Sequence, residues 1–240
     1  MSDAAPARVL AGEGLKHRAI RSFVLRAGRV TAKQTRGLNE GMARHGVSYA
    51  ASWIDLAHTF GRTAPTVLEI GFGMGASTAE IAAAQPENNF IAVEVHPPGV
   101  GNLCNLLDEQ ALTNVRVIAH DAVAVLMRMI AAGSLAGVHI YFPDPWHKAR
   151  HHKRRLVNPP LVALIASRLA VGGYVHLATD WVPYAEQMLE VLSAEPLLAN
   201  TAEGYAERPA WRPETKFERR GIKLGHEVRD VLFRRLKSPL

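Results

Sequence analysis

Short apolar runs alternate with amphipathic stretches from residue 66 to residue 193, and this alternation constrains the fold more than any other feature of the chain. The apolar runs are typical of buried β-strands, and the longer amphipathic stretches are typical of helices. We expect strands at 66–70, 89–95, 115–119, 137–142 and 173–179, and helices at 75–85, 100–112, 121–132, 161–170 and 181–193. Strands that alternate with helices form right-handed βαβ units. The sequence therefore predicts an α/β protein with a doubly wound, mostly parallel sheet, whose ligands bind beyond the carboxyl ends of the strands.

The two ends of the chain have weaker patterns. Residues 227–236, "EVRDVLFRRL", alternate with a period of two, which predicts a late strand, and we expect this strand at an edge of the sheet. Residues 1–60 have no strand pattern, and we expect them to form a basic N-terminal arm with some helix around 40–60. The main domain is then expected at 61–240.

Length and composition exclude several classes of protein. The 240 residues are 48% hydrophobic, which is enough for one large domain with a substantial core. No apolar run approaches the ~20 residues that span a bilayer, and the first residues lack the layout of a secretory signal. The single cysteine excludes an internal disulfide and fits a reducing compartment, so we expect a cytoplasmic protein without a membrane anchor.

The net charge of +6 is distributed unevenly. Residues 1–37 carry a balance of +6, residues 147–155 carry +5 and residues 205–240 carry +5, whereas the segments between them are acidic. An acidic body with three basic patches favours a polyanionic partner such as nucleic acid. A solvated basic surface remains the alternative that charge alone does not exclude.

A glycine-rich turn follows the first expected strand in "VLEIGFGMG". Gly71 and Gly73 remove the Cβ atoms that would keep a ligand away from the backbone, and Gly75 comes one residue too early for a dinucleotide fingerprint. Glu69 precedes the turn inside the strand. This E-x-G-x-G-x-G pattern resembles that of methyltransferases that bind S-adenosylmethionine, and a plain tight turn is the alternative.

Acidic residues close four successive strands. Glu69 and Glu94 lie at the ends of the first two strands, and Asp121 and Asp144 follow the third and fourth. Glu94 is placed to bind ribose hydroxyls, or is a solvated acid. Asp121 is placed to face an adenine amino group, or caps the next helix. Four acids at one edge of a sheet repel one another, and a cationic sulfonium cofactor would offset that repulsion.

The stretch "YFPDPWHKARHHKRR" sets Asp144 between two prolines and before Trp146. Prolines restrict the backbone, and the indole offers a face to a base or a cation. Asp144 is therefore our candidate for the reacting base, with a rigid turn as the alternative. The five Lys/Arg residues that follow would hold a phosphate backbone, and they disfavour a metal bound by the neighbouring histidines.

Two later stretches carry further candidates. Asp180 ends the fifth strand in "HLATDW", where it binds substrate or caps the next helix. In "RPETKFERRG", Thr215 and Glu218 have the spacing of a capping box, and Phe217 in this basic stretch could stack on a base.

Taken in order, "EIGFGMG", "VEVHPPGVG", "YFPDPWHKARHHKRR", "HLATDW" and "RPETKFERRG" make the chain resemble the bacterial tRNA (guanine-N7)-methyltransferases, from about Ile20 to nearly the C-terminus. That family has a Rossmann-like class I fold and methylates a guanine in the variable loop of tRNA with S-adenosylmethionine. The resemblance implies cofactor-binding roles for Glu69, Gly71, Gly73, Glu94, Asp121 and Asp144, with Asp144 also catalytic. It implies substrate-binding roles for Lys148, Arg150, Lys153, Arg154, Arg155, Asp180, Thr215, Lys216, Phe217 and Glu218.

Two rival functions belong to other classes. A nicotinamide-dependent oxidoreductase is disfavoured by the glycine spacing. A non-catalytic RNA-binding protein with a vestigial cofactor site is disfavoured because Asp144 and the other strand-end acids are all present. We expect tRNA as partner, no bound metal, and a monomer, with a dimer left open.

Overall fold

The computed structural model describes residues 30–215, 218–219, 225 and 227–237, so Lys216, Phe217 and the first half of the basic arm lie outside the described residues. The described chain folds around one seven-stranded sheet with strand order β3-β2-β1-β4-β5-β7-β6. The sheet is parallel from β3 to β5, and β7 joins it antiparallel to both of its neighbours.

The strands are β1 Thr66–Ile70, β2 Asn89–Val93, β3 Val115–Ile118, β4 Leu135–Tyr141, β5 Leu169–Thr179, β6 Leu198–Asn200 and β7 Arg229–Arg235. The α-helices are α1 Ala32–Arg36, α2 Met42–His45, α3 Leu56–Phe60, α4 Ala76–Ala84, α5 Pro97–Glu109, α6 Ala122–Arg128, α7 Pro159–Arg168 and α8 Val182–Ser193. A π-helical turn η1, Gly37–Gly41, joins α1 to α2, and a 3-10 helix η2, Ala149–Arg154, lies in the basic loop. No helix in the described ranges is long and apolar enough to cross a membrane.

The expected α/β fold with a mostly parallel sheet is confirmed, and each of the five strands and five helices expected between 66 and 193 is present. The expectation for the late strand was wrong in one respect. β7 pairs with both β5 and β6, so it is an inner strand, and the short β6 forms the edge. β6 has only three residues, too few for a periodic pattern to reveal it in the sequence.

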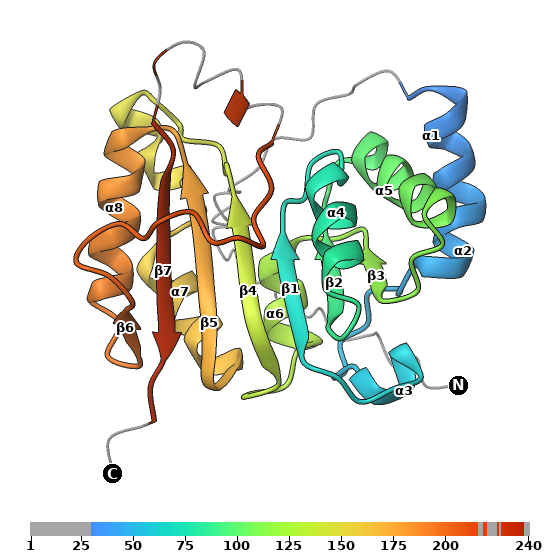
Figure 1. Cartoon of the computed structure of the whole chain (residues 1–240), viewed down its shortest axis with the longest axis horizontal. Helices are drawn as coiled ribbons and strands as arrows, with labels where there is room; N and C mark the ends of the chain where they lie inside the picture. The colour runs from blue at the N-terminus through green and yellow to red at the C-terminus, as the bar shows by residue number, and fades with distance from the viewer. Residues whose placement is uncertain (1–29, 216–217, 220–224, 226, 238–240) are drawn as a thin grey trace, which may run out of the picture.

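Helices cover the two faces of the sheet differently (Figure 1). On one face, α6, α7 and α8 bury the larger core against β1, β4, β5 and β7, with Leu68, Ile140 and Phe233 at its centre. On the other face, α4 and α5 bury a second core against β1, β2 and β3. In Figure 1 the coil that follows β6, orange-red in the view, crosses in front of β7 and β5, where none of the described helices covers this second face.

The described part of the N-terminal segment packs onto this domain. Its helical part lies against α5, where a Cβ added to Gly37 would meet the carbonyl oxygen of Gly101 at 2.0 Å. Farther along, the Val47 amide donates to the Val117 carbonyl at 2.9 Å and so extends the edge at β3. Helix is found at 32–45 and 56–60, partly earlier than the 40–60 that we expected.

Candidate active site

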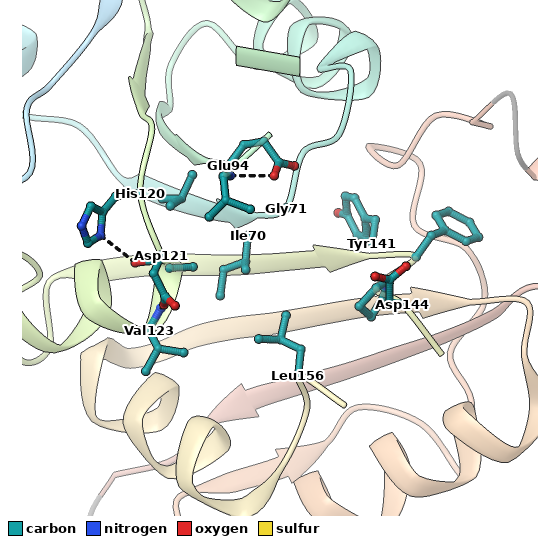
Figure 2. Close-up of a pocket in the computed structure, with 14 residues that line it drawn as sticks. Ile70, Gly71, Glu94, His120, Asp121, Val123, Tyr141, Asp144 and Leu156 are labelled. Atoms are coloured by element: carbon teal, nitrogen blue, oxygen red, sulfur yellow. Dashed lines mark hydrogen bonds between the residues drawn. The ribbon is translucent and has the colours of Figure 1, made fainter. Parts of the chain in front are cut away.

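A cavity of about 220 Å³ lies at the carboxyl ends of β1, β2, β3 and β4, the place expected for ligands of such a sheet. Figure 2 shows Glu94, Asp121 and Asp144 at three separate positions around it. The strand order brings these side chains together, because β1 has β2 on one side and β4 on the other. The remaining walls are mostly apolar, and they include Ile70, Val123 and Leu156.

The glycine turn after β1 leaves open space where side chains would stand. Gly71 and Gly73 have φ values of +74° and +59°, and a Cβ added to either would meet nothing within 4 Å. Gly75 differs, because its Cβ would lie 2.6 Å from that of Leu103, so this glycine serves helix packing. A Cβ on Gly99 would meet the Gly73 carbonyl oxygen at 1.9 Å, so the start of α5 supports the turn from behind. The first two glycines therefore leave room for a ligand against the backbone.

Glu94 is fixed by three backbone amides. Its Oε1 accepts from the amides of Val95 at 2.6 Å and His96 at 3.0 Å, and its Oε2 accepts from the Gly73 amide at 2.9 Å. A carboxylate has about four lone-pair sites, so this one retains acceptor capacity toward the cavity. The bond to Gly73 joins the end of β2 to the glycine turn, so the Glu94 carboxylate is held in place at the cavity rather than free in solvent.

Asp121 lines the same cavity and caps a helix as well. Its Oδ1 accepts from the amides of Val123 at 2.8 Å and Ala124 at 3.3 Å, at the N-terminus of α6. Next to it, His120 also lines the cavity and stacks on Tyr49, with ring centroids 3.8 Å apart and an interplanar angle of 3°. The sequence pointed to Asp121 but gave no sign that the N-terminal segment reaches the cavity wall through Tyr49.

Glu69 is buried within β1 rather than exposed to the cavity, with 4% of its surface accessible. Burial raises the pKa of this carboxyl to about 7, because the charged form loses its hydration there. Its backbone partner across to β4 is His139. Glu69 therefore lies inside β1 and is not among the residues that line the cavity, unlike Glu94, Asp121 and Asp144.

The loop after β4 carries Asp144 in a strained backbone. Phe142 and Trp146 have φ values of +50° and +47°, which are unfavourable for residues with side chains and cost on the order of 1–3 kcal/mol each. Asp144 lies midway between them, exposed at the rim of the cavity. Strain of this kind persists where the surrounding structure holds a side chain in a functional orientation.

The basic loop divides into exposed and buried cations. Lys148, Arg150 and Lys153 are exposed on η2 and the turn before it. Arg154 lies over the indole ring of Trp146, with its guanidinium carbon 5.1 Å from the ring centroid. These four cations therefore lie on the surface of the loop that carries Asp144.

Arg155 is different, because only 3% of its surface is accessible. Its Nε donates to the Pro145 carbonyl at 2.9 Å, and its Nη1 donates to the side-chain oxygen of Gln187. A guanidinium held in this way fixes the Asp144 loop onto α8. The sequence groups Arg155 with the substrate-binding cations, but its burial favours a role in supporting the loop.

Of the later candidates, the structure describes Asp180, Thr215 and Glu218. Asp180 follows β5 and is half-buried, and the N-cap residue of α8 is Trp181 rather than Asp180. The capping-box spacing of Thr215 and Glu218 is confirmed, since the Glu218 amide donates to Thr215 Oγ1 at 3.0 Å and the Thr215 amide donates to Glu218 Oε2 at 3.3 Å. Glu218 is buried with 4% of its surface accessible, so its carboxylate faces the protein and not solvent.

Sequence reasoning missed a group of buried polar residues on β4, β5, β7 and the coil before β7, namely Tyr141, His176, Asp230 and Arg212. A signal for three of them exists in the sequence, since "VHIY", "VHLA" and "VRDV" place Tyr141, His176 and Asp230 within otherwise apolar strands. Within the described ranges, no group of three or more His, Cys, Asp or Glu side chains is arranged to hold a metal ion.

A doubly wound sheet with a glycine turn after β1 and acids at the ends of β2, β3 and β4 defines a class I S-adenosylmethionine-dependent methyltransferase. Solved structures share this fold. The 16S rRNA methyltransferase KamB superposes with a TM-score of 0.57 at 15% identity, covering 78% of this chain and 95% of that one. An rRNA methylase from Streptococcus thermophilus gives a TM-score of 0.51 at 13% identity, covering 72% and 88%.

The sequence comparisons are more specific. Residues 63–231 match the family described as "Putative methyltransferase". A tRNA (guanine-N(7)-)-methyltransferase from Burkholderia cenocepacia is 65% identical over 92% of this chain and 87% of its own length. One of the same name from Chromobacterium violaceum is 62% identical over 91% and 96%. This chain belongs to the tRNA (guanine-N7)-methyltransferase family.

The residues around the cavity fit S-adenosylmethionine. The open space before Gly71 and Gly73 admits a ligand against the backbone, and the acceptor capacity left on Glu94 suits the hydroxyls of a ribose. The acids around the cavity suit a cationic ligand better than a phosphate-bearing one.

Proposed function

We propose that this chain transfers a methyl group from S-adenosylmethionine to N7 of a guanine in the variable loop of tRNA. The observation that carries the proposal is the position of Asp144, on a strained loop at the rim of a cavity that suits the cofactor, beside exposed cations. Membership of the family supports the substrate and the reaction. We further propose that the protein acts as a monomer in the cytoplasm.

When bound, S-adenosylmethionine would supply a methyl group on a sulfonium, whose S–CH3 bond breaks as the N7–CH3 bond forms and leaves the neutral thioether S-adenosylhomocysteine. The binding, orientation and charge stabilisation are supplied by residues of this chain. Guanine N7 has a lone pair, so no strong base is needed to create the nucleophile. Glu94 binds the ribose, Asp121 faces the adenine, and Gly71 and Gly73 let the cofactor lie against the turn. With the cofactor held by these residues, its methyl group would face Asp144 at the end of the neighbouring strand, and such positioning would lower the barrier.

Asp144 acts on the base. Positive charge passes onto the guanine ring as the methyl group is transferred, and a fixed carboxylate beside the ring stabilises that charge. The same carboxylate can accept the N1 proton, which the methylated ring holds more weakly, and this is the second form of the mechanism. The two forms differ in whether a proton moves from guanine N1 to Asp144, and both need the carboxylate in its ionised form.

The exposed cations position the RNA. Lys148, Arg150 and Lys153 bind the phosphate backbone beside the cavity, and Asp180 with the segment 215–218 contacts the nucleotide itself. Entry of the base requires it to leave its stack, which costs a few kcal/mol that backbone contacts offset. Cations that bind phosphates fix the register of the RNA and do not read its bases.

A direct test is to incubate the protein with methyl-labelled S-adenosylmethionine and bulk tRNA, digest the RNA and identify the labelled nucleoside. We expect the label in 7-methylguanosine alone, at one position in the variable loop. Label in any other nucleoside, or none in the tRNA, would reject the proposal. Binding of tRNA without any transfer would favour the alternative of a non-catalytic RNA-binding protein.

A further inference from the structure

A series of buried hydrogen bonds links Glu218 to Tyr141 through Arg212, Asp230 and His176. Arg212 donates from Nη1 and Nη2 to the Glu218 carboxylate at 2.6 and 2.8 Å, and from Nε and Nη2 to the Asp230 carboxylate at 2.7 and 2.9 Å. His176 Nε2 lies 2.7 Å from Asp230 Oδ1, and His176 Nδ1 lies 3.0 Å from the Tyr141 hydroxyl. All five side chains are buried.

The protonation states in this chain follow from the partners. Burial opposes the charge of Asp230, but hydrogen bonds from His176 and Arg212 outweigh it and lower the pKa of this carboxyl. An ionised Asp230 only accepts, so His176 donates from Nε2. Burial lowers the pKa of His176, which is therefore neutral, and its Nδ1 accepts from Tyr141. The direction of each hydrogen bond in this series is thus defined, with Arg212, His176 and Tyr141 as donors.

Arg212 also contacts the loop of the proposed catalytic residue. Its guanidinium carbon lies 5.9 Å from the centroid of the Phe142 ring, and Phe142 is the strained residue two positions before Asp144. One guanidinium therefore touches the capping box of the substrate segment through Glu218 and the start of the Asp144 loop through Phe142. Asp230, on β7, ties the same guanidinium to the sheet.

We propose that Arg212 is a positioning residue that holds the capping box of Thr215 and Glu218 beside the loop of Asp144, with Asp230 and His176 as its buried anchor. The inference rests on the proposed function and deepens it. It also reassigns Glu218, whose carboxylate is bonded to Arg212 and to the Thr215 amide, from contact with the substrate to support of the segment that makes that contact.

The test is Arg212→Lys, which keeps the positive charge but removes the planar fork that reaches two carboxylates at once. Arg208→Lys is the matched control, because Arg208 lies in the same segment and forms only an exposed ion pair with Glu214 at 3.3 Å. Such exposed pairs contribute little. Methyl transfer to tRNA is measured with saturating cofactor, well below the melting temperature of each variant, and divided by the number of cofactor-binding sites in the sample.

We expect Arg212→Lys to lower kcat/KM for tRNA at least tenfold, mainly through kcat, and to leave the Kd for S-adenosylmethionine within twofold of wild type. Arg208→Lys should stay within twofold in both. A purely structural Arg212 would lower the melting temperature and leave the rate per cofactor site unchanged, and that result would overturn the inference.

A second variant guards against loss of folding in the first. Glu218→Gln keeps the shape of the side chain and removes the charge that Arg212 binds, and the same loss of kcat is expected, with Glu214→Gln as its control. If Glu218→Gln methylates tRNA at the rate of Glu214→Gln, the inference is wrong. If wild-type protein forms no 7-methylguanine in tRNA, the proposed function itself fails, which is a separate result.

Discussion

Asp144 is the residue on which the proposed chemistry depends most. Asp144→Asn keeps the volume of the side chain and removes its charge, so we expect turnover to fall by at least a hundredfold, of the order seen when one group that stabilises transition-state charge is lost. The affinity for tRNA should change little, because the exposed cations are intact. Single-turnover rates and filter binding measure the two quantities, and a variant with wild-type single-turnover rates would remove Asp144 from the mechanism.

We propose that Glu69, although buried outside the cavity lining, makes binding of the cofactor depend on pH. Its pKa of about 7 means that the carboxyl is mostly protonated below neutral pH in the free protein. The ammonium group of the cofactor favours the ionised form, so binding must displace the proton at low pH. We expect the affinity for S-adenosylmethionine to rise between pH 5.5 and 7, approaching tenfold per pH unit at the acid end, as one linked proton requires.

Calorimetry in buffers of different ionisation enthalpy measures both the affinity and the proton release. Glu69→Gln should bind more weakly at pH 7 and lose the pH dependence. An affinity of the wild-type protein that does not change over this range would show that Glu69 does not contact the charged end of the cofactor.

At the scale of elements, the basic loop combines two functions that the sequence does not separate. The pattern "HKARHHKRR" identifies five cations next to the site. Sequence alone could not show that Arg155 turns inward, because that depends on Gln187 of α8 and on the turn of the loop at Pro145. We therefore expect substitution of the exposed cations and substitution of the buried Arg155 to have different effects.

Replacing Lys148, Arg150 and Lys153 by Ala should weaken tRNA binding and leave cofactor binding unchanged. Each lost phosphate contact on single-stranded or loop RNA reduces the slope of log affinity against log salt by about 0.7, so the slope should become shallower by about two. Binding measured over a range of salt concentrations tests this. A slope equal to that of wild type would make this loop an ordinary solvated surface.

Arg155→Ala is the contrasting variant. It leaves the Pro145 carbonyl and the Gln187 side chain without their donor, and an unsatisfied buried group costs about 1–3 kcal/mol. We expect a lower free energy of unfolding in urea and an unchanged salt slope for tRNA. A shallower salt slope with unaltered stability would return Arg155 to the group of RNA-contacting cations.

At the scale of the whole molecule, the fold and the cavity could be predicted from the sequence. The buried polar contacts of the C-terminal segment and the position of β7 in the sheet could not. The strand and helix periodicity from 66 to 193 is continuous, and the acids at the strand ends mark the cavity edge. The bonds among Tyr141, His176 and Asp230 join three strands that lie far apart in the chain, so local patterns do not reveal them. The position of β7 between β5 and β6 could not be predicted for the same reason, because strand pairing depends on the whole sheet and not on the local sequence.

The central claim is that the protein methylates N7 of one guanine in tRNA, and a substrate lacking only that atom tests it most directly. Two tRNA molecules are assembled with guanosine or 7-deazaguanosine at the variable-loop position mapped with bulk tRNA, and each is incubated with labelled S-adenosylmethionine and excess enzyme. Our account predicts one methyl group per guanosine-containing tRNA and none in the 7-deaza molecule, with similar affinity for both. Equal methylation of the two molecules would contradict it.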